Sequence, residues 1–292
     1  MDTIIQKARI LVEALPYIQR FRDAFIVVKY GGSTMDDRAL MDSILTDVAF
    51  MAAVNMRPVV VHGGGKAISR RMKEAGLSAR FVKGLRVTDA PAMAIVYDEI
   101  QNVLNPEIIR TLEEKGARAR GIPGETIFQV VQKSEPDPET GEMLNWGLVG
   151  DIRSVDPQPI LDAWRDGILP VVTPIGRDAD GQRYNLNADD AASAVAVALK
   201  ARKLVFLSDV PGLLRNPEDE RTIISTVRIR DVERLIQEGV IEGGMLPKIR
   251  SAADAILAGV AKVHLVDGRI PHSLLLEIYT DAGIGTEIIP ND

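Results

Sequence analysis

Lys29 is followed by two glycines, Gly31 and Gly32, after the apolar run 25–28 in the segment FIVVKYGGST. Glycines at a strand-to-helix turn let the backbone approach an anion closely, and the free N–H groups of the helix start attract it. A lysine at a buried strand end is costly unless it meets a charged partner or an anionic ligand. Its long stem can also carry the ammonium group out to solvent. The segment indicates an anion-binding turn.

A second glycine turn, Gly63 to Gly65, follows His62, which makes this histidine a candidate ligand contact. Two familiar phosphate motifs do not fit the turn. A P-loop needs Ser or Thr after its lysine, but Lys66 is followed by Ala67, and the dinucleotide fingerprint needs a third glycine where Ile68 stands. A tight turn without a ligand is an alternative for either turn alone, but two turns at neighbouring strand ends favour a ligand site.

Three amide and carboxylate side chains, Asn185, Asn187 and Asp189, alternate along an extended segment just before an apolar helix. This alternation places them on one side of the segment, which suggests that they hold something polar. Such residues are also common helix caps, and capping is the alternative for Asp189 and for Asp190.

Lys248 stands among two glycines and a proline in the segment GGMLPKI. It resembles Lys29 in this setting, and the alternative is a surface lysine at an ordinary helix start. The three histidines, His62, His264 and His272, lack the mutual spacing of metal ligands, so a structural zinc site is not expected.

The elements that position these residues follow a repeating strand–helix order. This order predicts an α/β fold, a three-layer αβα sandwich around a mostly parallel central sheet. Strands that are apolar throughout are typical of such sheets, because both faces are buried. Ligands bind beyond the carboxyl ends of these strands, where the glycine turns lie. The predicted strands are 25–30, 57–62, 126–133, 168–175, 203–209, 261–268 and 285–289, and the predicted helices are 36–54, 65–76, 90–115, 188–201, 230–238, 247–258 and 274–281.

Three segments predict irregular or exposed structure. The helix 90–115 should be broken or bent near Pro106. Residues 134–151, with Pro136, Pro138 and Gly141, should form a hairpin or an exposed flap. Residues 176–187 predict a hairpin around an Asp-Gly pair.

The chain divides into an arm and two lobes. Residues 1–24 form an amphipathic helical arm, which Pro16 should kink or split. This arm packs either on its own domain or on another subunit. Residues 25–185 and 186–292 are expected to form an N-terminal and a C-terminal lobe.

Composition excludes several classes of protein. The 292 residues carry a net charge of −6, so there is no general basic field and nucleic acid is not an expected partner. Cysteine is absent, which excludes disulfides, thiolate metal sites and a cysteine nucleophile. No run of about 20 apolar residues spans a membrane, and a cytoplasmic location is expected.

Seven motifs in order from about residue 25 to the C-terminus resemble the amino acid kinase family: VVKYGGS, VVVHGGGKAIS, KGLRVTD, GLVGDI, NLNADDAA, LSDVPGLL and GGMLPKI. The resemblance is to the members that act on an acetylated amino acid. It implies that ATP donates its γ-phosphoryl group to the side-chain carboxylate of N-acetyl-L-glutamate, giving N-acetyl-L-glutamyl 5-phosphate. A carboxylate is ionised at neutral pH and needs no general base, so catalysis is positioning and positive charge.

The resemblance assigns roles residue by residue. Lys29 and Lys248 match two catalytic lysines that stabilise the transferring phosphoryl group, and Asp189 matches the aspartate that holds both. The residues that match contacts to the acid substrate are Gly64, Gly65, Arg86, Asn185 and Asn187, with Arg86 gripping the α-carboxylate. The residues that match the ATP site are Gly31, Gly32, Ser208, Asp209, Val210, Pro211, Gly212 and Leu213. Mg²⁺ is expected on the phosphates, without a protein ligand.

The resemblance also implies regulation. Arginine-inhibited members have an additional N-terminal helix and form a hexamer, a trimer of dimers, by pairing these helices. His264, Glu277 and Gly283 match positions that line the arginine pocket, where a guanidinium group needs a carboxylate. The alternative for Glu277 is a solvated helix residue.

Three other functions are alternatives. The first is a related kinase for aspartate, glutamate or an aminoadipate derivative, although GLRVT and NLNAD favour the acetylated substrate. The second is an inactive sensor that keeps only the arginine site, which the pair Lys29 and Lys248 disfavours. The third is a dinucleotide-binding oxidoreductase, which the failed fingerprint disfavours.

Overall fold

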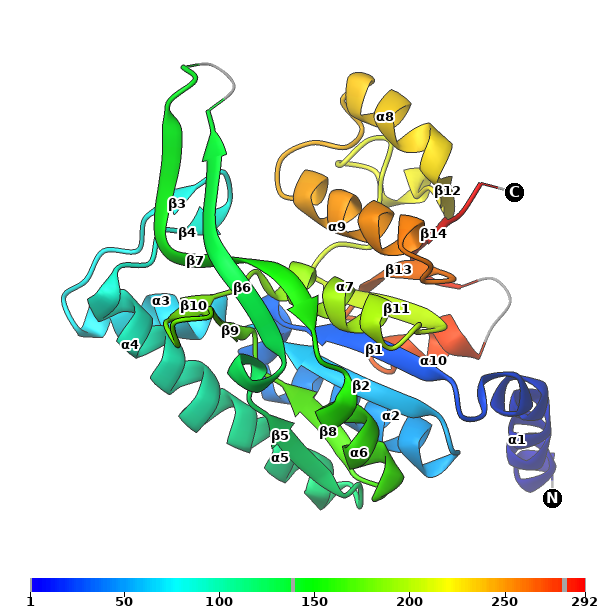
Figure 1. The fold of residues 1–292 in the computed structure, drawn as a ribbon. Helices are drawn as coiled ribbons and strands as arrows, with labels where there is room; N and C mark the ends of the chain where they lie inside the picture. Colours follow the sequence, from blue (N-terminus) through cyan, green and yellow to red (C-terminus); the bar gives the residue numbers. More distant parts are fainter. Residues whose placement is uncertain (1, 138–139, 280–282, 292) are drawn as a thin grey trace.

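The computed structural model describes residues 2–137, 140–279 and 283–291. An eight-stranded sheet forms its centre, in the order β12-β14-β13-β11-β1-β2-β8-β5 (Figure 1). Within the described residues, the pairing of β13 with β14 is antiparallel and the other neighbours in this sheet pair in parallel. The strands are β1 (Phe25–Tyr30), β2 (Arg57–His62), β5 (Ala119–Ile122), β8 (Leu169–Val172), β11 (Lys203–Ser208), β12 (Thr226–Arg228), β13 (Val263–Asp267) and β14 (Thr286–Ile289).

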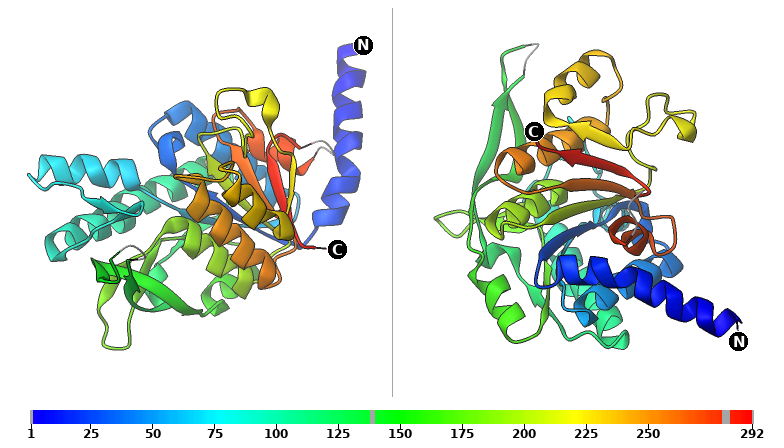
Figure 2. Two further views of the ribbon diagram at one scale, coloured as in Figure 1. Left: turned by 90° about the horizontal axis from the view of Figure 1, so that it is seen from above. Right: turned by 90° about the vertical axis from the view of Figure 1, so that its right-hand side faces the viewer.

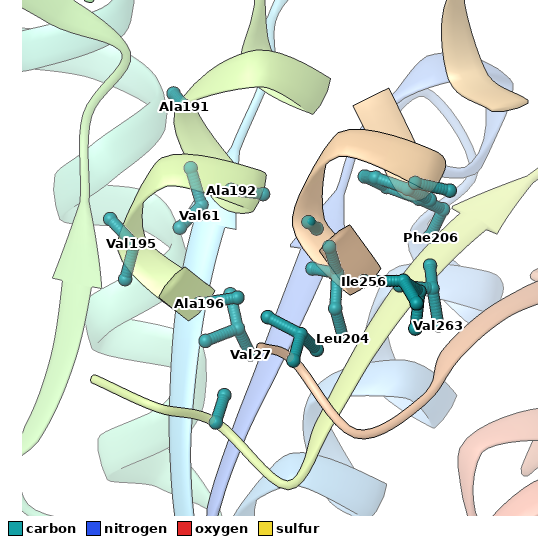
Figure 3. Packing of buried hydrophobic residues seen from close by; sticks show 14 of the residues in the cluster. Val27, Val61, Ala191, Ala192, Val195, Ala196, Leu204, Phe206, Ile256 and Val263 are labelled. Atoms are coloured by element: carbon teal, nitrogen blue, oxygen red, sulfur yellow. The ribbon is translucent and has the colours of Figure 1, made fainter. Parts of the chain in front are cut away.

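Helices cover both faces of this sheet, which confirms the predicted αβα sandwich. Alternate residues of β1 point to opposite faces, so Val27 packs into one hydrophobic cluster and Val28 into the other. Figure 3 shows the first cluster, where Val27 and Leu204 meet the small side chains of α7. The first face is covered by α6 (Gln158–Arg165), α7 (Ala188–Ala198), α8 (Ile229–Gln237) and α9 (Met245–Leu257), and the second by α2 (Arg38–Ala53), α5 (Asn105–Glu114) and α10 (Ser273–Ile278).

Helix α1 (Asp2–Phe21) projects from the body of the molecule (Figure 2). It runs unbroken through Pro16, so the predicted split there is wrong. Its C-terminal end packs on the body through Phe21, but Leu11 and Val12 farther along are more than two-thirds exposed. The apolar stripe of the arm is thus largely uncovered within this chain.

A long hairpin and a smaller sheet lie beside the main sheet. The predicted flap at 134–151 is part of a hairpin of β6 (Phe128–Pro136) and β7 (Met143–Val155), which rises from the molecule in Figure 1. Residues 138–139 of the predicted flap lie outside the described residues. The predicted hairpin at 176–187 is present as β9 (Ile175–Arg177) and β10 (Arg183–Asn185), which pair with each other. Strand β9 also pairs with β6, and β10 with β7.

Several elements were not predicted. Two short strands, β3 (Phe81–Val82) and β4 (Leu85–Arg86), pair in a small separate hairpin. The predicted helix 90–115 consists of α4 (Ala90–Asp98), a π-helical segment η2 (Glu99–Leu104) and α5, and the π turn lies just before Pro106. The unpredicted strands β5 and β12 complete the central sheet. The remaining elements are α3 (Gly65–Glu74) and the 3₁₀ turns η1 (Gly32–Met35), η3 (Gly124–Thr126) and η4 (Glu220–Thr222).

No helix in the described ranges is both long and apolar enough to cross a membrane.

Candidate active site

The carboxyl ends of β1, β2 and β11 lie side by side at one edge of the sheet. The register pairs Lys29 with Val61 on β2 and with Phe206 on β11. Lys29 therefore stands beside the glycine turn that follows His62 and beside the loop that follows Ser208. The topology thus places the two predicted glycine turns next to each other.

Asp189 lies between the two predicted lysines. Its carboxylate is 3.0 Å from Nζ of Lys29 through Oδ1 and accepts a 2.6 Å hydrogen bond from Nζ of Lys248 through Oδ2. Asp189 is in the first turn of α7, but it does not cap the helix. Asn187 does so, because its Oδ1 accepts hydrogen bonds from the backbone N–H groups of Asp189 and Asp190. The cap therefore leaves the Asp189 carboxylate available to the lysines.

This cluster is buried, and burial controls its titration. Burial lowers the pKa of Lys29, and the neighbouring Asp189 offsets only part of that effect. Burial alone would raise the pKa of Asp189, but the two ammonium groups outweigh it and the pKa is lowered. One carboxylate thus faces two lysine side chains, and the site carries excess positive charge that an anion can neutralise.

The glycine turns are close to these charges. A Cβ atom at Gly31 would lie 3.2 Å from Nζ of Lys29, and one at Gly64 would lie 2.7 Å from Cδ1 of Leu104. Gly32 adopts a φ of +81°, which disfavours other residues. The turns therefore leave room for the lysine and for backbone contact with a ligand.

His62 supports the second turn from below and is not positioned to contact a ligand. Its ring is fully buried, with Nδ1 2.9 Å from the carbonyl oxygen of Gly63 and Nε2 3.1 Å from the amide nitrogen of Asn105. Burial lowers the pKa of His62 to about 4. A neutral imidazole that donates from Nδ1 to Gly63 and accepts from Asn105 fits both contacts, so the ring holds the turn in place.

A cavity of about 530 Å³ opens in front of Lys29 and Asp189. Arg86 lies in its wall and donates hydrogen bonds to the carbonyl oxygen of Gly65 at 2.8 Å and to Oγ of Ser69 at 2.7 Å. Its guanidinium group also lies over the ring of Phe81, 4.8 Å from the centroid. Among the described residues, no ion pair joins this mostly buried arginine to a carboxylate, so its charge is available to an anion.

The cavity gathers the predicted acid-binding residues and several that were not predicted. Gly64, Gly65, Arg86, Asn185 and Asn187 all line it. The unpredicted lining includes Lys66, Ile68, Ser69, Phe81 and Ile100. Of these, Ser69 follows Gly65 by one helical turn, and this spacing alone could have indicated it.

The predicted nucleotide loop lies at the same edge but outside this cavity. Ser208 is buried, whereas Asp209 and Val210 are exposed. Gly212 has a φ of +148°, and a Cβ there would lie 2.6 Å from Oγ1 of Thr286. The same hydroxyl accepts a 2.8 Å hydrogen bond from the N–H of Leu213, which fixes the end of the loop.

A second cavity, of about 420 Å³, lies at the opposite edge of the sheet, near the amino ends of β11 and β13. His264 and Glu277 meet there, with Nδ1 2.6 Å from Oε1, and both side chains are buried. Gly283 is adjacent, since a Cβ at this position would lie 3.1 Å from Oε2 of Glu277. The three predicted residues are thus brought together, and the end of α1 contributes Tyr17 and Arg20 to the same cavity.

No cluster of three or more histidine, aspartate or glutamate side chains in the described part of the chain could hold a metal ion. This leaves the expected absence of a protein ligand for Mg²⁺ as a prediction.

The sequence profile of the amino acid kinase family matches residues 24–267. The chain belongs to the amino acid kinase family. It is 44% identical to acetylglutamate kinase of Carboxydothermus hydrogenoformans, over 99% of this chain and all of that protein. It is 45% identical to acetylglutamate kinase of Akkermansia muciniphila, over 98% of this chain and 96% of that one.

A solved structure of N-acetylglutamate synthase from Neisseria gonorrhoeae, complexed with coenzyme A and L-arginine, is also similar. The TM-score is 0.80 and the identity 25%, over 97% of this chain and 65% of the synthase chain. The kinase family therefore shares this sandwich with a longer protein.

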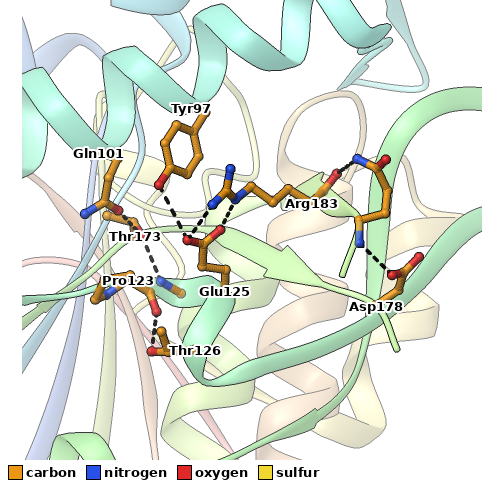
Figure 4. Close-up of polar contacts among 10 residues, drawn as sticks. Tyr97, Gln101, Pro123, Glu125, Thr126, Thr173, Asp178 and Arg183 are labelled. Atoms are coloured by element: carbon orange, nitrogen blue, oxygen red, sulfur yellow. Dashed lines mark hydrogen bonds and ion pairs between the residues drawn. The ribbon is translucent and has the colours of Figure 1, made fainter. Parts of the chain in front are cut away.

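The polar cluster in Figure 4 lies beside the 530 Å³ cavity. Arg183 on β10 forms an ion pair with Glu125 on η3, and its guanidinium group lies 4.4 Å from the ring centroid of Tyr97 on α4. Two residues later, β10 ends in Asn185, which lines the cavity. The cluster therefore anchors the strand that carries this side chain.

Proposed function

We propose that this protein transfers the γ-phosphoryl group of ATP to the side-chain carboxylate of N-acetyl-L-glutamate, giving N-acetyl-L-glutamyl 5-phosphate, a step of arginine biosynthesis. The observation that carries the proposal is the carboxylate of Asp189 held between the ammonium groups of Lys29 and Lys248. The similarity to acetylglutamate kinases along nearly the whole chain supports the choice of substrate.

The chemistry requires an anion to attack a polyanion, so its main barrier is charge repulsion. In this proposal Lys29 stabilises the attacking oxygen and the transferring phosphoryl group, and Lys248 stabilises the leaving group. Asp189 fixes both ammonium groups in position and does not act as a base. Backbone N–H groups at Gly31 and Gly32 contact the phosphates.

The acid occupies the 530 Å³ cavity, which is lined mostly by the proposed N-terminal lobe, residues 25–185, and also by Asn187 and Asp189. Arg86 binds the α-carboxylate, since its guanidinium group is mostly buried and lacks an acidic partner in the described structure. Gly64, Gly65, Asn185 and Asn187 complete the contacts. The proposed C-terminal lobe, residues 186–292, binds the nucleotide through the loop from Ser208 to Leu213.

We propose Mg²⁺ as the metal that accompanies ATP, held by the phosphates. The phosphate oxygens would supply the ligands, because no cluster of carboxylates in the described residues offers a metal site on the protein. When bound, the metal neutralises phosphate charge.

An ATP-dependent hydroxamate assay tests the reaction, because hydroxylamine traps an acyl phosphate. N-acetyl-L-glutamate should give the strongest signal, and L-glutamate, L-aspartate and an N-acetylated aminoadipate serve as comparisons. A stronger signal with any of these three would overturn the choice of substrate. No signal with any acid would favour the non-catalytic sensor.

We also propose that L-arginine inhibits the enzyme by binding the second cavity, with Glu277 receiving the guanidinium group. The support is a buried carboxylate beside His264 and Gly283, together with the synthase structure that contains L-arginine. A homo-hexamer built as a trimer of dimers would cover the exposed apolar stripe of α1.

A further inference from the structure

The long β6–β7 hairpin is bonded to the segment that carries Arg86. Trp146 on β7 is fully buried, and its indole Nε1 donates a 3.0 Å hydrogen bond to the carbonyl oxygen of Val82 on β3. Val82 pairs with Leu85 in the small β3–β4 hairpin, whose last residue is Arg86. The indole therefore connects the projecting hairpin to the wall of the acid cavity.

Two backbone hydrogen bonds strengthen the same connection. The N–H of Thr88 donates to the carbonyl oxygen of Trp146 at 2.9 Å, and the N–H of Leu148 donates to the carbonyl oxygen of Thr88 at 2.6 Å. Gly147 between them has a φ of +69°, and a Cβ there would lie 2.4 Å from the Thr88 oxygen. Only glycine permits this close approach.

Thr88 passes the connection on to two residues of the cavity. Its Oγ1 donates a 3.0 Å hydrogen bond to the carbonyl oxygen of Arg86 and accepts a 3.3 Å hydrogen bond from the amide of Asn185. Thr88 is itself fully buried. Through Thr88, the hairpin therefore fixes both the backbone at Arg86 and the side chain of Asn185.

We propose that Trp146 is a positioning residue for acid binding, which acts through the β3–β4 hairpin to set the orientation of Arg86. This inference rests on the proposed function, because it concerns the affinity for the α-carboxylate of N-acetyl-L-glutamate. It assigns to the β6–β7 hairpin a share in substrate selection, although Trp146 itself does not line the cavity.

The chain offers a matched control, because it has two tryptophans. Trp146→Phe removes a donor and leaves the carbonyl oxygen of Val82 without it. Trp164→Phe, on α6, removes an indole N–H that has no hydrogen-bond partner among the described residues. Both substitutions remove an indole from a packed position, but only Trp146→Phe removes a hydrogen bond, the one to Val82, while a phenyl ring can keep a contact with Nζ of Lys133.

We expect Trp146→Phe to raise the KM for N-acetyl-L-glutamate about 2- to 12-fold, as the loss of one hydrogen bond predicts. The KM for ATP and kcat should stay within about twofold of the unsubstituted protein, because Lys29, Asp189 and Lys248 are untouched. Trp164→Phe should leave all three constants unchanged. Thermal unfolding of both variants reports any general loss of structure.

A competitor without the α-carboxylate sharpens the test. The inhibition constant of 4-acetamidobutyrate should be equal in Trp146→Phe and the unsubstituted protein, because this compound has no group for Arg86 to bind. An equal weakening of both compounds would overturn a role through Arg86. An unchanged KM in a folded Trp146→Phe variant would overturn the proposal altogether.

Fluorescence supplies a readout that does not depend on turnover. In Trp164→Phe, Trp146 is the remaining indole, and N-acetyl-L-glutamate without ATP should change its emission with a saturable dependence. An emission that is constant across concentrations up to tenfold above the KM would contradict the connection. A protein that never forms hydroxamate but shows this change would refute the proposed reaction while supporting the positioning role.

Discussion

The two edges of the central sheet carry the same kinds of groups in opposite arrangements. At the carboxyl edge, one carboxylate, Asp189, lies between two ammonium groups, and Arg86 adds a further positive charge without an acidic partner in the described residues. At the amino edge, the buried carboxylate of Glu277 contacts His264 and accepts a hydrogen bond from the N–H of Ile284. The first arrangement is suited to binding a polyanion, and the second offers a buried carboxylate that can pair with a cationic group.

The amino-edge cavity also contains basic side chains, and these make it suited to an amino acid rather than to a simple cation. Arg20, Arg202 and Lys203 line it together with Glu277. A ligand with both a guanidinium and a carboxylate group could use both signs of charge. Strand β11 runs from Lys203 at this edge to Ser208 at the other, so the proposed inhibitor would act on catalysis through a change in conformation.

The largest expected effect comes from substituting one buried lysine at each edge, which tests whether the two edges differ in function. Lys29 and Lys203 are equally buried, on adjacent strands of the sheet. Lys29→Met should lower kcat about 10²- to 10³-fold, because it removes a charge that stabilises the transition state. Steady-state rates of hydroxamate formation, with saturating ATP and N-acetyl-L-glutamate, measure the effect.

The control, Lys203→Met, should keep kcat within about twofold in the absence of arginine. Equal losses of rate in the two variants would mean that burial, and not position at the carboxyl edge, determines the effect. The comparison of edges would then fail.

A second substitution separates inhibition from catalysis. Glu277→Gln should raise the arginine concentration for half-inhibition at least about tenfold, because loss of a charged hydrogen-bond partner costs about 1.5–3 kcal/mol. The kcat without arginine should not change. Arginine titrations at fixed substrate concentrations measure both quantities.

The oligomeric state provides the contrast for this variant. Glu277→Gln should still elute as the proposed hexamer. Deletion of residues 1–15 should yield dimers, because it removes the exposed stripe but keeps Tyr17 and Arg20 at the cavity. Full arginine sensitivity in Glu277→Gln would contradict the proposed site.

The sequence predicted the inner strands of the sheet and the glycine turns at their carboxyl ends, because these depend on local patterns, but it did not predict the two outermost strands, β5 and β12. Strand β1 is apolar up to Lys29, its next-to-last residue, and glycines mark the turn that follows it. The meeting of Asp189 with Lys248 is different, since 59 residues separate them and no spacing rule relates them. Family resemblance supplied that pair.

What could not be predicted depends on tertiary contact. Strands β3 and β4 have two residues each, too few for any periodicity, yet they place Arg86 in the cavity. His62 stands where a ligand contact is expected, but burial turns its ring toward Asn105 and the backbone. The bond between Trp146 and Val82 joins residues 64 apart along the chain.

The smallest expected effect concerns the buried imidazole at the carboxyl edge. His62 has a pKa of about 4 in the folded protein, because burial disfavours its charged form, and about 6.5 in the unfolded chain. The unfolded chain therefore binds a proton below pH 6.5 that the folded protein binds only near pH 4. The contribution of His62 to stability is complete above pH 6.5 and falls as the pH decreases toward 4.

Urea unfolding at pH 7 and pH 5 should reveal this term. His62 should account for a loss of about 2 kcal/mol in the free energy of unfolding between these values, and His62→Gln should remove that loss while its amide can still bond Gly63 and Asn105.

At the amino edge, His264→Gln changes two titrations, because His264 also helps to lower the pKa of Glu277, whose burial acts in the opposite direction. Its curve should therefore differ from the unsubstituted protein near pH 4.5 as well, whereas His62→Gln should differ mainly between pH 6.5 and 4. Parallel curves for His62→Gln and the unsubstituted protein would show that the turn beside Lys29 does not depend on a neutral imidazole.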